Sequence, residues 1–115
     1  MYTMLMKTTI DKSFVEFIIE QIKDVGNISH RYMFGGCAIY CGNKVVALIC
    51  KNQLYIRFTQ GGKKFAKKVS EKLPYPGAKP HFLIEDKVDD KEWLCNLIRI
   101  TANELPEPKV KRQNA

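Results

Sequence analysis

Three short runs of β-branched and aromatic residues follow one another between Arg31 and Phe58. They are separated by Gly42-Asn43 and by Lys51-Asn52-Gln53, and both of these segments favour tight turns. This succession of apolar runs and turn signals predicts a β-meander, in which consecutive strands pair antiparallel. Such a sheet needs apolar cover, so the flanking segments are expected to supply helices that pack on it.

Gly35-Gly36 divides the first of these runs into two strands, and the rest of the chain adds helices and one further strand to the meander. The predicted helices span about Ser13 to Val25, Lys63 to Leu73, and Asp89 or Asp90 to Leu105. The predicted strands span about Ile28 to Phe34, Cys37 to Cys41, Lys44 to Cys50, Leu54 to Phe58 and His81 to Glu85. The run from Leu54 alternates less cleanly and is expected nearer an edge. This order predicts an α+β fold, a mainly antiparallel sheet of about five strands packed with three helices.

The first helix carries signals at both of its ends. Ser13 and Glu16 fit a capping box, in which each side chain satisfies a backbone amide of the other residue. Gly26-Asn27 should end the helix, because both residues tolerate the left-handed conformation of a C-terminal cap. The residues expected to form its apolar stripe are Phe14, Phe17, Ile18, Ile22 and Val25.

Two strands of the meander, Cys37 to Cys41 and Lys44 to Cys50, are apolar at almost every position. Such strands should lie centrally and be covered on both faces, or face a partner chain. If the helices cover only one face, the other face leaves an apolar patch of the kind that marks interaction sites. Tyr40, Tyr55 and Arg57 are candidates for this surface, and a protein partner or a homodimer is expected.

The length of 115 residues suits one domain. We expect residues 1–105 to fold as that domain and residues 106–115, rich in proline and lysine, to form a flexible basic tail. No apolar run approaches the ~20 residues of a membrane helix, and the N-terminus lacks the pattern of a signal peptide. The four cysteines are therefore expected as free thiols in the cytoplasm, with no membrane contact.

No group of residues in the sequence predicts catalysis. Cys37 and Cys41 would lie ~13 Å apart on a strand, which is too far to share a metal ion. Neither His30 nor His81 lies in a recognisable motif, and the acids near Asp89 fit the start of a helix. We therefore expect a non-enzymatic protein with no metal, no cofactor and no small-molecule substrate.

The net charge of +7 permits contact with acidic partners such as nucleic acid. Lys63, Lys64, Lys67 and Lys68 would form a basic arc on the second predicted helix. Such an arc could contact phosphates, whereas a solvated helix face is the alternative interpretation of the same charge run. Aromatic residues for base stacking are not interleaved there, so any nucleic-acid binding should be weak, non-specific and strongly salt-dependent.

The segment Arg31-Tyr32-Met33-Phe34-Gly35-Gly36 resembles the N-terminal domain of the TfoX (Sxy) competence regulators. The spacing to Leu54-Tyr55-Ile56 and to the closing helix with Trp93 matches as well, so the resemblance covers about Phe14 to Leu105, as a stand-alone domain. It implies a domain of bacterial regulators of DNA uptake that acts on transcription with other proteins. It implies no cofactor and no catalytic residues.

Within this motif the residues are expected to serve the structure first. Gly35 and Gly36 should let the strand bend or bulge and let another backbone approach. Met33 and Phe34 should then fill the core, while Arg31 is the polar member left free. A binding surface made by all five residues is the alternative.

Overall fold

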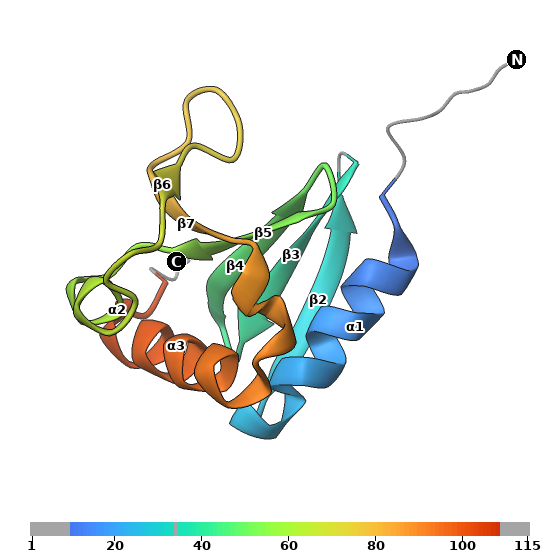
Figure 1. The fold of residues 1–115 in the computed structure, drawn as a ribbon. Coiled ribbons are helices and arrows are strands. Elements are labelled where there is room, and N and C mark those ends of the chain that lie inside the picture. The colour runs from blue at the N-terminus through green and yellow to red at the C-terminus, as the bar shows by residue number, and fades with distance from the viewer. Residues whose placement is uncertain (1–9, 34, 109–115) are drawn as a thin grey trace, which may run out of the picture.

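Four strands connected by hairpins form the larger part of one antiparallel sheet, which confirms the predicted meander. The computed structural model describes residues 10–33 and 35–108 (Figure 1). The elements are α1 (Lys12–Ile22), η1 (Lys23–Val25), β2 (Ile28–Met33), β3 (Gly36–Cys41), β4 (Lys44–Cys50), β5 (Gln53–Arg57), α2 (Gln60–Phe65), β6 (Glu71–Lys72), β7 (His81–Ile84), η2 (Asp86–Asp89) and α3 (Lys91–Glu104). The fold is α+β, as predicted.

The sheet has six strands in the order β2-β3-β4-β5-β7-β6, one more than expected. The additional strand, β6, is only two residues long and has no sequence signature of its own. The expectation that the Leu54 strand lies near an edge is wrong, because β7 returns along its free side and pairs Leu54 with Ile84. The edges are β2 and β6.

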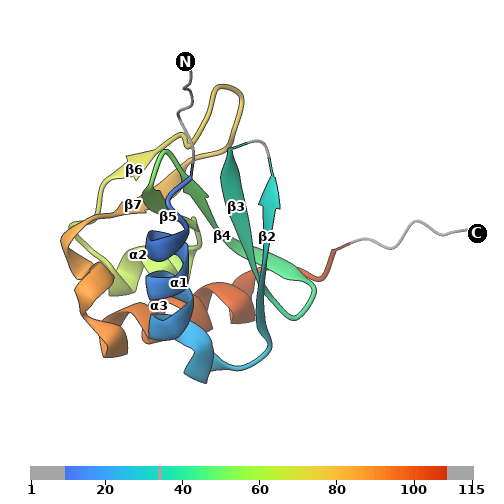
Figure 2. The ribbon, with the colours of Figure 1, turned by 90° about the vertical axis from the view of Figure 1, so that its right-hand side faces the viewer.

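All three helices lie on the same side of the sheet (Figures 1 and 2). The side chains of the sheet that face them alternate along each strand, and the register places them side by side. We call this the covered face and define it by Cys37, Ile39, Ala47, Ile49, Leu54, Ile56, Phe82 and Ile84, all of them buried. They form one core with the buried faces of α1 and α3.

Helix α1 begins with a different cap from the expected one. The carboxylate of Asp11 accepts a hydrogen bond from the backbone N–H of Ser13 at 2.9 Å, so Asp11 takes the cap position and the Ser13 capping box is wrong. The helix buries Val15, Ile18 and Ile22, whereas Phe17 is 38% exposed. The apolar stripe is therefore rotated relative to the predicted one.

Helix α2 is shorter than predicted and ends at Phe65. It starts at Thr59, whose hydroxyl accepts a hydrogen bond from Gly62 N–H at 2.9 Å. Beyond the helix, the carbonyl of Ser70 accepts a hydrogen bond from Leu83 N–H at 2.8 Å as the chain joins the sheet. Pairing with β7 thus replaces the expected further turns of helix, and Leu73 is exposed rather than buried.

The ends of the other helical segments agree with the predictions. Asp90 caps α3 by accepting a hydrogen bond from Trp93 N–H at 3.1 Å, and the helix ends at Glu104. Gly26 and Asn27, with φ of 102° and 55°, turn the chain after η1 as expected. Of the predicted tail, residues 106–108 are described, and 109–115 lie outside the described residues.

Candidate interaction surface

The side of the sheet that faces away from the helices carries a row of apolar residues. Register places Ala38, Leu48, Tyr55 and Leu83 side by side on β3, β4, β5 and β7, with Arg31 of β2 at one end of the row. We call this side the open face. Its residues are Ser29, Arg31, Met33, Gly36, Ala38, Tyr40, Val45, Leu48, Cys50, Gln53, Tyr55, Arg57, Lys72, His81 and Leu83.

A hollow of about 470 Å3 lies over this row. Its walls are Met33, Cys37, Ala38, Leu48, Cys50 and Tyr75. Tyr75 comes from the loop between β6 and β7 and is 53% exposed, so one aromatic ring stands at the rim. Because almost every wall residue is apolar or carries sulfur, the hollow suits an aliphatic or aromatic side chain better than a charged group.

The turn from β2 to β3 shapes one end of the hollow. Gly35 has φ of 75°, a conformation that residues with a Cβ rarely adopt. Gly36 serves a different purpose, since a Cβ there would lie 2.6 Å from the carbonyl oxygen of Ile49 on β4. Gly35 lies in the turn, Gly36 is the first residue of β3 and pairs with Met33, and the irregularity of the sheet lies instead at Ile39 and Tyr40, opposite β4.

The other members of the Arg31–Gly36 motif lie at the surface. Met33 is exposed on the open face at the edge of the hollow, so the expectation that it fills the core is wrong. Strand β2 is an edge strand with almost every residue exposed, which leaves Met33 without a layer above it. Arg31 is exposed as well. Phe34 lies outside the described residues.

The structure separates the three residues predicted to form an interaction surface. Tyr55 is only 7% exposed, and its hydroxyl donates a hydrogen bond to Gln53 Oε1 at 3.2 Å. Burial raises the pKa of the Tyr55 phenol, which therefore stays protonated. Tyr55 is thus a buried member of the apolar row. Tyr40 is half-buried. Arg57 is half-buried, and its guanidinium donates a hydrogen bond to the carbonyl of Val45 at 3.4 Å.

The charged strand residues on the open face are all cations, while Glu85, just after β7, lies beside Tyr55 and Leu83. Among the strand residues that the structure describes, Glu71 is the only carboxylate, and the register aligns it with Phe82 of the covered face. Its carboxylate pairs there with Lys63 at 3.0 Å. The open face carries Arg31, Arg57 and Lys72. The apolar row is therefore flanked by cations.

His81 is a buried member of the open face that sequence reasoning left without a role. It is 5% exposed, and its Nδ1 donates a hydrogen bond to the carbonyl of Lys79 at 2.7 Å. Burial lowers the pKa of His81, the bond to Lys79 acts in the opposite direction, and Arg57 lowers the pKa further. His81 is therefore a neutral ring that holds the start of β7 to the preceding loop.

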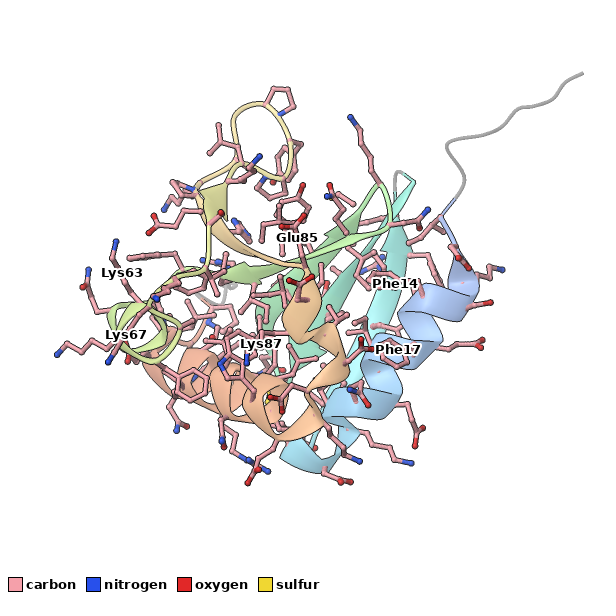
Figure 3. All side chains as sticks on the ribbon, in the orientation of Figure 1. Phe14, Phe17, Lys63, Lys67, Glu85 and Lys87 are labelled. Carbon is pink, nitrogen blue, oxygen red and sulfur yellow. The ribbon has the colours of Figure 1, made fainter. Side chains whose placement is uncertain are left out.

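The four lysines predicted to form a basic arc do not share one helix face. Lys63 and Lys64 are in α2, whereas Lys67 and Lys68 follow its end. Lys63 also pairs with Glu71 and lies 6.0 Å from the ring centre of Phe58. Figure 3 shows Lys63 and Lys67 projecting from the α2 region, within the helical layer. Lys68 lines a surface hollow together with Leu83, at the β7 end of the apolar row, and with Glu85.

The cysteines in the part of the chain that the structure describes form no disulfide and no metal site. The cysteines are free thiols, and no group of three or more His, Cys, Asp or Glu residues there is placed to hold a metal ion. Burial raises the pKa of Cys37 and of Cys50, so both thiols are weak nucleophiles. No helix among residues 10–33 and 35–108 is long and apolar enough to cross a membrane.

Comparison with known proteins gives two matches that cover most of this chain. The TfoX N-terminal domain matches residues 20–105. A relative from Spirochaeta aurantia, described as an uncharacterized 12.7 kDa protein in the trpE 5' region, is 32% identical over 102 residues. That alignment spans 89% of this chain and 89% of the relative. The matched segment includes the whole sheet and α3, and with them the hollow.

Proposed function

The chain belongs to the TfoX N-terminal domain family, and from this premise we propose that it is a non-enzymatic regulatory module that binds another protein through its open face. The observation that carries the proposal is the unequal cover of the sheet. All three helices lie on one side, and the other side holds an apolar hollow of about 470 Å3. An apolar surface of this kind favours a protein partner.

The regulatory part of the proposal comes from the family. The resemblance to competence regulators implies a role in DNA uptake and transcription, exerted through other proteins in the cytoplasm. The non-enzymatic part is supported by the state of the reactive groups. The thiols of Cys37 and Cys50 have raised pKa values, and the Nδ1 of His81 is engaged with a backbone carbonyl.

Affinity capture with three forms of the protein tests this function. Leu48→Lys places a cation in the floor of the hollow, and Phe17→Lys places one on the exposed side of α1 as a matched control. Wild type and Phe17→Lys should retain the same bound protein, and Leu48→Lys should lose it while still unfolding in one cooperative transition above the temperature of the capture. Retention by Leu48→Lys, or loss by Phe17→Lys alone, would place the binding surface elsewhere.

Nucleic-acid binding is the second candidate, favoured by the net charge of +7 and by the exposed lysines Lys64, Lys67 and Lys68. Contacts made by lysines alone are electrostatic and carry no base recognition. Affinity should then fall steeply with salt and be similar for unrelated sequences. A gel shift with two unrelated duplexes measures both. Sequence-selective binding at physiological salt would make this candidate the first.

A further inference from the structure

We propose that the partner of the open face is an acidic protein segment, in which carboxylates flank a bulky apolar side chain. The inference rests on the proposed function and goes beyond it by naming the chemistry of the partner. Its two components are an apolar hollow and the cations Arg31, Arg57 and Lys72 of the strands on the same face, while Glu85 lies beside Tyr55 and Leu83 at the β7 end.

The apolar component is the hollow between Met33 and Tyr75, with Leu48 and Ala38 in its floor. A leucine or phenylalanine side chain of a partner would be enclosed there by apolar groups from β2, β3, β4 and the loop before β7. Tyr75 is exposed at the rim, where its ring can close over the inserted side chain. Burial of such an anchor in a pocket is the usual source of affinity at a protein interface.

The basic component surrounds the hollow on two sides. Arg31 lies at one end of the apolar row, and Tyr55 lies three strand spacings away, roughly 14 Å. Arg57 is two residues further along β5, about 7 Å from Tyr55. His81 and Lys72 continue the Arg57 row on β7 and β6. An extended segment across the sheet therefore passes from Arg31, over the hollow, to two further cations, Arg57 and Lys72, which flank the neutral ring of His81.

A second copy of this chain fits the open face poorly. Two open faces packed together would lie about 10 Å apart, the usual spacing of stacked sheets. Each would contribute the three cations Arg31, Arg57 and Lys72, against the single carboxylate of Glu85 beside Tyr55 and Leu83. The nearest acid to Arg57 in the same surface depression is Glu107, which lies 3.8 Å from Lys44. Like charges on two sheets about 10 Å apart repel each other. This repulsion disfavours self-association and favours an acidic partner.

Nucleic acid also fits the hollow less well than a protein segment does. Single strands bind to sheet faces by stacking bases on exposed aromatic rings. Tyr55 is 7% exposed and cannot stack on a base, which leaves Tyr75 at the rim as the exposed ring beside the hollow. The floor residues, Ala38 and Leu48, are aliphatic. The cations would attract a phosphate backbone, but the hollow selects an apolar side chain.

The test is a titration of the isotope-labelled full chain with synthetic peptides, followed by backbone amide shifts. The probe is a peptide of about nine residues, roughly 30 Å when extended, in which glutamates alternate with leucine and phenylalanine. Two matched peptides carry glutamine or lysine in place of each glutamate, and oligothymidylate represents single-stranded nucleic acid. The glutamate peptide should shift amides of β2, β3 and β4 and should bind about tenfold more tightly than the glutamine peptide.

Variants of the protein supply the second arm. Arg31→Glu should weaken binding of the glutamate peptide about tenfold and improve binding of the lysine peptide. Lys64→Glu makes the same charge change in α2, and its only effect should be a small one through net charge. Equal binding of all three peptides, no shift on the open face, or tighter binding of oligothymidylate there would overturn the inference.

The two proposals fail in different ways. If Leu48→Lys loses its captured protein but charge on the peptide has no effect, the open face is the binding surface and the acidic partner is wrong. A dimer that light scattering detects for wild type, and that Leu48→Lys dissociates, would also overturn the acidic partner, because the occupant would be a second copy.

Discussion

Leu48 and Ile49 are neighbours on β4, yet they lie on faces with opposite surroundings. Ile49 points to the helices and is 0% exposed, whereas Leu48 points to the open face and remains half-buried at the floor of a hollow. Both faces are apolar at the centre of the sheet. The apolar residues of β4 therefore have two separate roles. The covered face stabilises the fold, and on our account the open face is kept for a partner.

The largest expected difference comes from truncating these two neighbours. Ile49→Ala should lower the free energy of unfolding by about 2–5 kcal/mol, because it leaves a cavity among fully buried side chains. Leu48→Ala should cost only about 1 kcal/mol, since its surroundings are partly solvated. Urea denaturation measures both. Equal losses in the free energy of unfolding would mean that the open face is part of the core. The proposed difference between the two faces would then be wrong.

The next largest loss of stability is expected where the backbones of β3 and β4 approach each other closely. Gly36→Ala should destabilise the protein by about 1–3 kcal/mol, because the added Cβ would lie 2.6 Å from the carbonyl oxygen of Ile49. The reason is close approach of β3 to β4 and not a left-handed conformation. Thermal unfolding of the variant checks this. An unchanged melting temperature would show that the strands can separate at no cost.

A smaller loss of stability is expected as the pH falls, and its source is His81 on the open face. Because the pKa of His81 is lower in the folded chain than the ordinary 6.5, the folded state binds fewer protons. Stability contributed by the neutral ring is therefore complete above about pH 6.5 and is lost as the pH falls through the folded pKa. His81→Gln should reduce this loss in urea titrations between about pH 5 and 7.5. If His81→Gln left the pH dependence of stability unchanged, the buried ring of His81 would not be its source.

The smallest effect on stability is expected for the cation at the end of the apolar row. Arg31→Glu should change the free energy of unfolding by no more than about 0.5 kcal/mol, since the side chain is exposed. A larger loss would assign Arg31 a structural role and would weaken its use as a probe of binding. Denaturation of wild type and variant under the same conditions makes this comparison.

The sequence predicted the meander well because its turn residues and apolar runs are local signals. Strand β4 was predicted with its observed ends, and Asp90 was named as a possible cap of α3. The errors lie where tertiary contacts decide. Ser13 and Asp11 are both good capping residues, and in the structure the helix starts at Lys12 with Asp11 as its cap and Val15 and Ile18 buried.

The candidate site, too, could be predicted only in part from local sequence signals. Apolar character on both sides of β3 and β4 predicted an interaction surface if the helices covered one face. The burial of Tyr55, the exposure of Met33 and the approach of Tyr75 depend on how β7 and its preceding loop return to the sheet. No local pattern in the sequence encodes that return, because β6 has only two residues.

Photo-cross-linking from one aromatic position on each side of the sheet tests the central claim most directly. Photoreactive benzoylphenylalanine replaces Tyr75, at the rim of the hollow, in one variant, and Phe17, exposed on α1, in the other. Both variants are irradiated in the source cell, and cross-linked proteins are identified by mass spectrometry. The account predicts a discrete adduct from position 75, with an acidic segment at the attachment point, and none from position 17. An adduct formed only from position 17 would contradict it.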